Sequence, residues 1–419
     1  MSFEEFGFNA SIMAGIRAVG YKTPTPVQSK TIPDTLKGHD VMGLAQTGTG
    51  KTAAFVLPML NRLISSPSVS GRGGRKAVRA LIVAPTRELA EQIDENIREL
   101  GSRTPIKSMT IYGGASAYNQ VKKLHRGVDI IVACPGRLLD HINQGNVDLS
   151  SVEMLVLDEA DRMLDMGFLP DIKRIVKHVP QKRQTLMFSA TMPDDIRRLT
   201  MQLMKDPVTA QVDHSMPAKT VSHALYPVAE HLKTPFLLRL LRDIESDSVL
   251  VFTRTKHRAK RVTDRLLKDG FKATPLQGNM TQGRRQESLK GFKSGKYQIL
   301  VATDIAARGV DVMSITHVIN YDIPDTADAY THRVGRTGRA ARTGEAFTFV
   351  TKADGPAVRS FERIMGMSLA CRELEGFDYK VPAPAKQAEA PRPMAAQRRQ
   401  SAAPSGRNKP GRQRARSIA

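Results

Sequence analysis

The chain has 419 residues, of which 41% are hydrophobic, and it carries a formal net charge of +22 with a pI of about 10.1. This length and apolar content suffice for two or three domains, and the positive charge predicts a polyanionic partner, either nucleic acid or an anionic membrane surface. No stretch of about 18 uncharged apolar residues occurs, which excludes a bilayer-spanning helix, and residues 1–6 lack the features of a signal peptide.

The two cysteines, Cys134 and Cys371, stand far apart in the sequence and belong to no group of metal-ligating residues. This pattern indicates neither a disulfide framework nor a metal cluster, and it predicts a protein of the reducing cytoplasm.

Short apolar runs alternate with amphipathic stretches between residues 25 and 208. The runs that we expect to be strands are 41–45, 80–84, 108–112, 129–133, 154–157 and 185–188. Helical stretches follow most of them, for example 87–100 and 193–203. This alternation predicts a mostly parallel sheet with helices on both faces.

A glycine-rich loop, residues 45–52, follows the first of these runs and leads into a helix. Such a loop directs backbone N–H groups and a helix N-terminus toward phosphate groups. Lys51 can then reach the β- and γ-phosphates, and the Thr52 hydroxyl can hold Mg²⁺. Ala45 replaces the glycine that the strict phosphate-loop pattern requires at its first position.

An acidic group, Asp158, Glu159 and Asp161, follows the apolar run 154–157. Asp158 can hold the Mg²⁺ shell, and Glu159 can orient or deprotonate an attacking water. Either motif alone also fits an ordinary strand–helix turn or a solvated helix start. Together, and in this order, they predict a nucleoside-triphosphate hydrolase.

The alternating pattern resumes after a less periodic region near residues 213–220. Strands are expected at 248–253, 273–276, 298–302, 316–320 and 346–350, with helices such as 257–268 between them. We therefore predict two tandem α/β domains, 1–212 and 221–379, joined by a linker at 213–220. Residues 380–419 contain ten Lys/Arg and one acid, a net of +9, and no apolar period, so we expect a disordered basic tail.

Four motifs in this chain resemble those of the DEAD-box ATP-dependent RNA helicases. They are the phosphate loop, the acidic group, Ser189-Ala190-Thr191, and the run 332–339 with Arg333, Arg336 and Arg339. The details are most similar to the bacterial RhlE-like group. The resemblance implies two RecA-like domains that close over ATP and single-stranded RNA.

The resemblance also implies a nucleotide site. Residues 20–28 resemble the Q motif, in which the Gln28 amide can read the adenine edge and Tyr21 can stack on the ring, although a Pro-rich turn before a helix is the alternative. The implied catalytic residues are Lys51, Asp158, Glu159, Arg336 and Arg339, and Asp161, Ser189 and Thr191 couple ATP to RNA. The implied nucleotide ligands are Phe3, Tyr21, Gln28, Ala45, Gln46, Thr47, Gly48, Thr49, Gly50, Lys51, Thr52, Gly309 and Asp311.

RNA contacts, again implied by the resemblance, use glycine backbone, Thr hydroxyls and Arg, which bind phosphates without reading bases. The residues are Pro85, Thr86, Arg87, Gly113, Gly114, Arg137, Thr255, Gln282, Arg285 and Thr303. Cys134 replaces the family's usual threonine and puts one of these contacts in doubt. The basic loop 71–76 is either a further RNA contact or a solvated loop.

We therefore expect an ATP- and Mg²⁺-dependent enzyme that unwinds short RNA duplexes or remodels RNA–protein complexes with little sequence preference. Its RNA would be a ribosomal precursor, a decay substrate or a structured message, with the RNA-decay machinery as one possible partner. Two alternatives are an RNA chaperone that anneals RNA through the basic tail, and a DNA helicase of the same superfamily.

Overall fold

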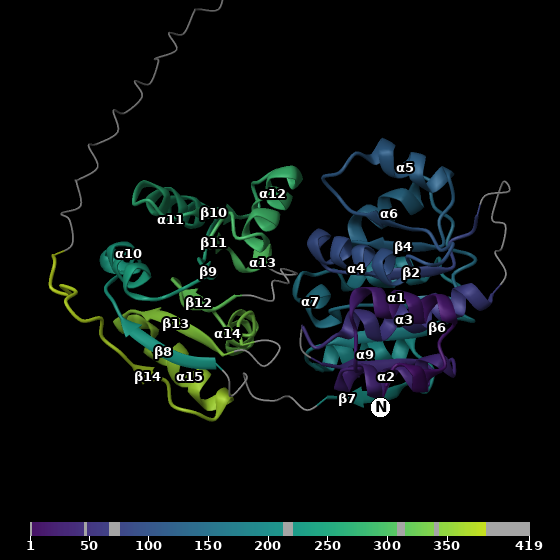
Figure 1. The fold of residues 1–419 in the computed structure, drawn as a ribbon, viewed down its shortest axis with the longest axis horizontal. Helices are drawn as coiled ribbons and strands as arrows, with labels where there is room; N and C mark the ends of the chain where they lie inside the picture. Colours follow the sequence, from purple (N-terminus) through teal and green to yellow (C-terminus); the bar gives the residue numbers. More distant parts are fainter. Residues whose placement is uncertain are drawn as a thin grey trace, which may run out of the picture. The chain divides into compact units, whose positions relative to one another are not determined.

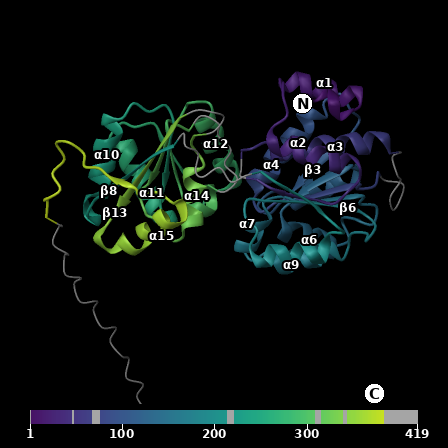
Figure 2. The ribbon, with the colours of Figure 1, turned by 90° about the horizontal axis from the view of Figure 1, so that it is seen from below.

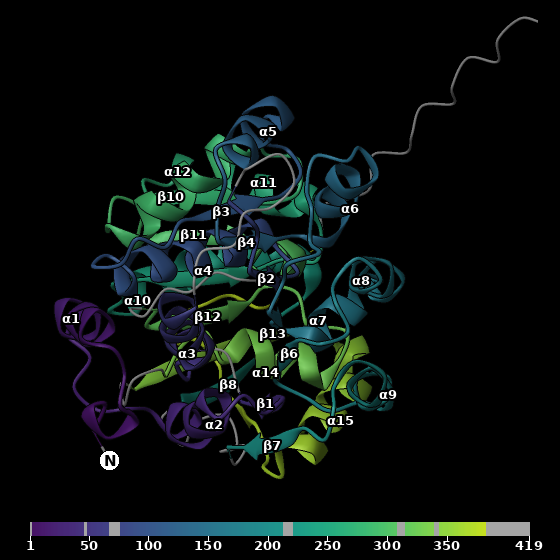
Figure 3. The ribbon, with the colours of Figure 1, turned by 90° about the vertical axis from the view of Figure 1, so that its right-hand side faces the viewer.

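Every apolar run predicted in the first half of the chain forms a strand of one sheet in the computed structural model. The model describes residues 2–45, 48–66, 76–212, 221–307, 315–338 and 343–382. The strands are β1 (Val41–Leu44), β2 (Ala80–Val83), β3 (Ser108–Ile111), β4 (Ile130–Ala133), β5 (Met154–Leu157), β6 (Gln184–Ser189) and β7 (Val208–Gln211). They pair in parallel in the order β3-β4-β2-β5-β6-β1-β7. Figure 3 shows all of these except β5 labelled in this order from top to bottom.

Helices cover both faces of this first sheet, as Figure 2 shows. One face carries α1 (Ala10–Val19), α2 (Pro26–Leu36), α3 (Lys51–Ser65) and α4 (Arg87–Leu100), and the other α5 (Ala117–His125), α6 (Pro135–Asn143), α7 (Ala160–Asp165), α8 (Leu169–Val176) and α9 (Asp194–Leu203). Neighbouring strand residues alternate between two cores: Ile82 packs with Phe55 on the first face, and Leu81 with Leu138 on the second. Burial on both faces explains why these strands are continuous apolar runs.

A second parallel sheet repeats this architecture in the same compact unit, Met1–Tyr379 (Figure 1). Its order is β10-β11-β9-β12-β13-β8-β14. The strands are β8 (Val221–Pro227), β9 (Val249–Phe252), β10 (Ala273–Leu276), β11 (Ile299–Ala302), β12 (His317–Asn320), β13 (Gly344–Val350) and β14 (Ala370–Cys371).

The helices of the second half also divide between two faces. Phe236 of α10 (Lys233–Asp243) and Val262 of α11 (Lys256–Lys268) pack into one core. The other face carries α12 (Gln282–Lys293), α13 (Asp304–Ala307), α14 (Ala327–Val334) and α15 (Gly355–Met365). The predicted class, two tandem α/β domains with parallel sheets, is confirmed.

Three strands that the sequence did not predict, β7, β8 and β14, lie at or beside sheet edges. The domain bounds remain a prediction, and the linker 213–220 and residues 383–419 of the tail lie outside the described part of the chain. No helix in the described ranges is both long and apolar enough to cross a membrane.

Candidate functional site

The phosphate loop connects β1 to α3 and ends in a backbone conformation that requires glycine. Gly50, the residue before α3, has φ +93°, and a Cβ there would lie 2.6 Å from Gln28 Nε2. Gln28 donates this Nε2 to Gly50 O at 3.0 Å and accepts the Thr25 N–H at 2.9 Å. Gln28, the residue predicted to read adenine, therefore also holds the phosphate loop. Its amide oxygen and its amide nitrogen can each form one more hydrogen bond. Gln46 and Thr47 lie outside the described residues.

Lys51, the first residue of α3, is only 6% exposed. Its ammonium finds no hydrogen-bond partner within the described part of the chain. A buried, unpaired ammonium is costly, so this atom indicates a site built for an anion. The same helix end directs N–H groups to that place, which suits a phosphate group.

Asp158 follows β5 and is 2% exposed. Burial raises the pKa of its carboxyl to about 6, a shift that Lys51 opposes and the neighbouring Glu159 increases. A carboxylate that is costly to ionise alone is well suited to a divalent cation, because the cation supplies the missing positive charge. The carboxylate of Asp158 and the hydroxyl of Thr52 are the oxygen donors that Mg²⁺ prefers.

Glu159 adopts a left-handed backbone conformation, φ +50°, which is strained for a residue with a side chain. Its N–H bonds Asp158 Oδ1 at 2.9 Å, and its carboxylate pairs with Arg162 at 2.8 Å. Arg162 is buried, and it is not among the residues predicted from the sequence. Its place three residues after Glu159 was the available signal, since i,i+3 side chains meet on a helix.

The three residues predicted to couple ATP to RNA form one hydrogen-bond network. Asp161 Oδ2 accepts the N–H groups of Ala190 and Thr191, each at 3.0 Å, and the Thr191 hydroxyl at 3.1 Å. Ser189 Oγ accepts the Asp161 N–H at 3.3 Å and donates to Thr191 O at 2.7 Å. The start of α7 is thereby tied to the end of β6, although the coupling role itself remains a prediction.

A cavity of about 260 Å³ collects most of the described residues predicted to bind nucleotide. Tyr21 and Gln28 line it together with the phosphate loop and the acidic pair. Phe3 lies in the core behind Tyr21, with the two rings stacked at 6.2 Å between centroids, so it supports the cavity wall rather than lining it. The lining residues from the phosphate loop and acidic pair are Gly48, Gly50, Lys51, Thr52, Asp158 and Glu159.

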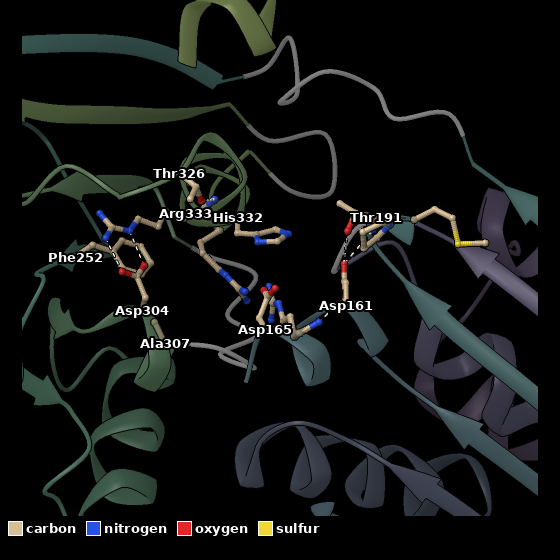
Figure 4. Close-up of a pocket in the computed structure, with 14 residues that line it drawn as sticks. Asp161, Asp165, Thr191, Phe252, Asp304, Ala307, Thr326, His332 and Arg333 are labelled. Atoms are coloured by element: carbon tan, nitrogen blue, oxygen red, sulfur yellow. Dashed lines mark hydrogen bonds and ion pairs between the residues drawn. The ribbon is translucent and has the colours of Figure 1, made fainter. Parts of the chain in front are cut away.

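A second cavity, of about 580 Å³, brings Asp161, Arg162 and Thr191 together with His332 and Arg336 (Figure 4). Arg336 is 4% exposed. The pKa of His332 is lowered to about 4 by burial and by the cationic Arg162. His332 is therefore neutral at physiological pH and can donate or accept a hydrogen bond without adding charge.

Arg333 on α14 lines the same cavity, and its guanidinium is already paired. It makes a bidentate ion pair with Asp304, at 2.6 Å for both contacts (Figure 4). It also donates to Asn320 Oδ1 at 3.1 Å. Such a fork fixes α14 to the ends of β11 and β12. Gly309, Asp311 and Arg339, which the resemblance assigned to the nucleotide, lie outside the described residues.

A third cavity, of about 570 Å³, contains many of the predicted RNA contacts. Gly114, Thr255 and Gln282 do not line it, although Arg87 packs on Gly114 and donates to Gln282 Oε1 at 3.4 Å. Loop residues 71–75 lie outside the described chain. The predicted contacts that line this cavity are Pro85, Thr86, Arg87, Gly113, Arg137, Arg285 and Thr303.

Acidic partners of Arg285 and of the neighbouring Gln286 were not predicted from the sequence. Glu88 Oε1 accepts from Arg285 Nε at 2.7 Å, and Glu91 Oε1 accepts from Gln286 Nε2 at 2.5 Å. The paired residues are almost 200 positions apart, so no local pattern could reveal them. Arg285 is 9% exposed and has its charge balanced in this structure.

Cys134 is the N-cap residue of α6 and makes no capping hydrogen bond. Burial raises the pKa of its thiol to about 12, so the group is a neutral thiol at physiological pH. Thr86 and Thr255 occupy the corresponding positions of α4 and α11, and both hydroxyl oxygens accept a backbone N–H. Their O–H protons remain able to donate to a phosphate.

Two protein-family models match the chain. The DEAD/DEAH box helicase model matches residues 25–199, and the helicase conserved C-terminal domain model matches residues 232–341.

Curated relatives include the DEAD-box ATP-dependent RNA helicase CshA of Geobacillus kaustophilus. It is 43% identical over 363 residues, which is 86% of this chain and 76% of the relative. The ATP-dependent RNA helicase CshA of Limosilactobacillus reuteri is 42% identical over 366 residues, covering 87% of this chain and 72% of the relative. These relatives are named CshA, so the expected RhlE-like subgroup is not confirmed.

Solved structures with the same fold include S. cerevisiae Dbp5 bound to RNA and ADP BeF3. It superposes with a TM-score of 0.79 at 28% identity and covers 89% of this chain and 95% of that one. The DEAD-box helicase Mss116 bound to ssRNA and UDP-BeF gives a TM-score of 0.80 at 28% identity, with coverage of 90% and 80%. The two sheets described above are therefore two tandem RecA-like domains.

Proposed function

This chain belongs to the DEAD-box ATP-dependent RNA helicase family, and we propose that its reaction takes place where Lys51, Asp158 and Glu159 meet. The chain is accordingly an enzyme that couples ATP hydrolysis to RNA unwinding. One observation carries the assignment of the site: the Lys51 ammonium is buried and has no hydrogen-bond partner among the described residues, at a helix N-terminus and beside two carboxylates. This arrangement fits a triphosphate with its Mg²⁺.

The residues of this site fit both the triphosphate and the Mg²⁺ ion. Lys51 and the N-terminal N–H groups of α3 would hold the phosphates, and Thr52 and Asp158 would hold Mg²⁺. Bound ATP supplies the phosphoryl group that is transferred to water, and the metal neutralises charge on it. Gln28 and Tyr21 would select adenine at the opposite end of the cavity.

The remaining roles follow from position and charge. Glu159 is held by Arg162 and is the group that would orient the attacking water. Arg336 would stabilise the negative charge that develops on the transferred phosphoryl group, a contribution of about 10³–10⁵ in rate for arginine fingers that have been tested. The Asp161–Ser189–Thr191 network joins the start of α7 to the end of β6. It would transmit the state of the nucleotide to the RNA site.

The cavity between Arg87, Arg137 and Thr303 is the proposed RNA site. Besides apolar residues such as Phe168 and the carboxylate of Glu88, its lining has several basic and hydroxyl-bearing side chains, chemistry that suits phosphates and predicts little sequence preference. Ribosomal precursors and the RNA-decay machinery remain proposed partners.

The narrower RhlE-like placement rests only on the motif details of the chain. A cytoplasmic location is likewise a proposal, and the two cysteines, which are both free thiols, support it.

Two variants separate phosphate binding from catalysis. We expect Lys51→Ala to weaken ATP binding about 10- to 100-fold, the loss that corresponds to one charge-assisted hydrogen bond. Glu159→Gln should retain ATP affinity and lower turnover about 10²–10⁴-fold, because it removes a general base. ATP affinity and RNA-stimulated phosphate release would be measured for both, with the exposed Lys37→Ala as a matched control. Wild-type turnover in Glu159→Gln would contradict the assignment.

The two alternative functions make different predictions in the same assay. An annealing protein would bind RNA without steady ATP turnover. A DNA helicase would be activated equally by DNA and RNA strands of one sequence. We expect phosphate release to rise markedly with the RNA strand and not with the DNA strand.

A further inference from the structure

Helix α5 lies at the β3 edge of the first sheet, as Figure 3 shows. It is attached through one side only. Gln120 donates to Tyr112 O at 3.0 Å and bonds His141 Nε2 at 3.1 Å, and Leu124 enters the core. These contacts fix the rotation of the helix, so the direction of its opposite side is also fixed.

That opposite side carries an unusual combination of residues. Tyr118 is 75% exposed, the most exposed large hydrophobic residue in the described part of the chain. Lys122, His125 and Arg126 follow at i+4, i+7 and i+8 and are also exposed. In a helix these spacings place Tyr118, Lys122 and His125 on one face, opposite Gln120 and Leu124, and Arg126, the C-cap residue with helical backbone angles, continues that face.

The stretch of chain that carries this face is basic, although Asp94 of α4 interacts with Lys123 of α5. Residues 101–128 contain five Lys/Arg and no Asp or Glu. Of the two helix neighbours of Tyr118 at i+3 and i+4, Val121 is a small apolar residue that is half-buried and Lys122 is an exposed cation, so Tyr118 belongs to no wide exposed apolar patch. A protein partner would need a wider apolar patch, whereas an isolated aromatic ring among cations suits a nucleic acid base and its phosphates.

The face also continues directly from the proposed RNA site. Gly114, against which the Arg87 guanidinium packs, precedes Tyr118 by four residues. Arg137 donates to Ala115 O at 3.3 Å, immediately before Ser116, the N-cap of α5. A strand that leaves Arg87 and Arg137 therefore meets the N-terminal turn of α5 next.

We propose that this face, Tyr118, Lys122, His125 and Arg126, binds single-stranded RNA that flanks the segment held in the cavity. A base stacks on the Tyr118 ring, and Lys122 and Arg126 bind the adjacent phosphates. The stacked base must be unpaired, because bases within a duplex already stack on their neighbours. The inference rests on the proposed RNA helicase function and names a second contact surface for its substrate.

The test compares RNA lengths with the full chain. The first probe is the shortest single strand that activates wild-type ATP hydrolysis, and two further probes extend it at the 5′ or the 3′ end. Affinities would be measured by fluorescence anisotropy with a non-hydrolysable ATP analogue. We expect Tyr118→Ala to weaken binding of one extended strand about fivefold or more, the effect of losing one base–aromatic stack, and to leave the short strand unchanged.

Matched variants separate stacking from charge. Tyr118→Phe retains the ring and should bind as wild type. Lys122→Ala with Arg126→Ala should reduce the salt dependence for the same extended strand, by a log–log slope of roughly 0.7 for each lost phosphate contact. Lys260→Ala with Lys268→Ala removes two exposed charges from α11 and should change neither measurement.

Two results would overturn the proposal: wild-type affinity of Tyr118→Ala for both extended strands, or an equal loss on the short strand. Failure of the proposed function itself is visible separately. In that case RNA would not stimulate ATP hydrolysis by the wild-type chain at all, whatever residue occupies position 118.

Discussion

At the scale of single residues, the site combines groups that are costly to bury with ligands that would offset that cost. The Lys51 ammonium has no hydrogen-bond partner in the described chain, and Asp158 and Glu159 are buried beside each other. Proteins retain such unfavourable arrangements mainly where function requires them. The nucleotide site is therefore expected to be less stable empty than loaded.

Cys134→Thr tests a second residue whose side chain does not suit its position, the N-cap of α6. Cys134 caps α6 without a hydrogen bond, and a threonine would supply a capping oxygen worth about 0.5–2 kcal/mol. We expect a higher Tm, and RNA affinity equal to or above that of the wild type, because a hydroxyl donor is added beside the proposed RNA site. Cys134→Val is the matched control, having similar volume and no hydroxyl. A marked loss of RNA affinity in the threonine variant would show that the thiol has a role of its own.

His223 predicts part of the pH dependence of stability. Burial lowers the pKa of its imidazole, and its Nδ1 bonds the Tyr330 hydroxyl at 3.0 Å. As pH falls below about 6.5, the unfolded chain takes up a proton that the folded chain resists, so stability present at neutral pH is lost. His223→Phe should lose less Tm than wild type between pH 7.5 and 5.5. An identical loss in both proteins would exclude this histidine as a contributor.

At the scale of elements, the sequence predicts best where one pattern dominates. Helix 87–100 has the same bounds in the structure as in the prediction, because its apolar period and the Thr86 cap agree. Edge strands were missed for the opposite reason. Apolar and polar residues alternate only weakly in β7, and both residues of β14 are exposed. Neither strand therefore produces an apolar run in the sequence. The left-handed turn at Glu159 also leaves no sequence signal, since glycine is absent there.

Gly15 shows a constraint between elements that no local pattern contains. A Cβ at this position of α1 would lie 2.0 Å from Leu100 O of α4. Gly15→Ala must therefore separate α1 from α4, at a cost of about 1–3 kcal/mol or more. We expect Tm to fall by roughly 2–4 °C for each kcal/mol lost. Ala18→Leu adds more volume on the exposed side of the same helix and should leave Tm nearly unchanged.

At the scale of the whole molecule, the parallel topology explains why scattered motifs meet. Residues that follow the carboxyl ends of β1, β2, β4, β5 and β6 all emerge at one edge of the first sheet, which is why ligands bind there in such folds. Sequence order therefore predicted that Lys51 and Asp158 would be neighbours. It could not predict Glu88 beside Arg285, because that pairing depends on how two separate helices face each other.

The basic tail is the largest sequence feature that this topology does not use. Ten Lys/Arg and one acid follow position 379, and the remaining chain carries a net +13 of the total +22. We predict that the tail tethers RNA without sequence preference and raises its local concentration near the motor. Truncation after Tyr379 should leave the maximal ATPase rate nearly intact and raise the RNA concentration needed to reach it. Binding should also become less salt-sensitive, because each lost phosphate contact removes roughly 0.7 from the log–log slope. RNA titrations of both forms at several salt concentrations would measure these effects, and identical slopes with identical half-saturation points would instead show a tail that serves solubility alone.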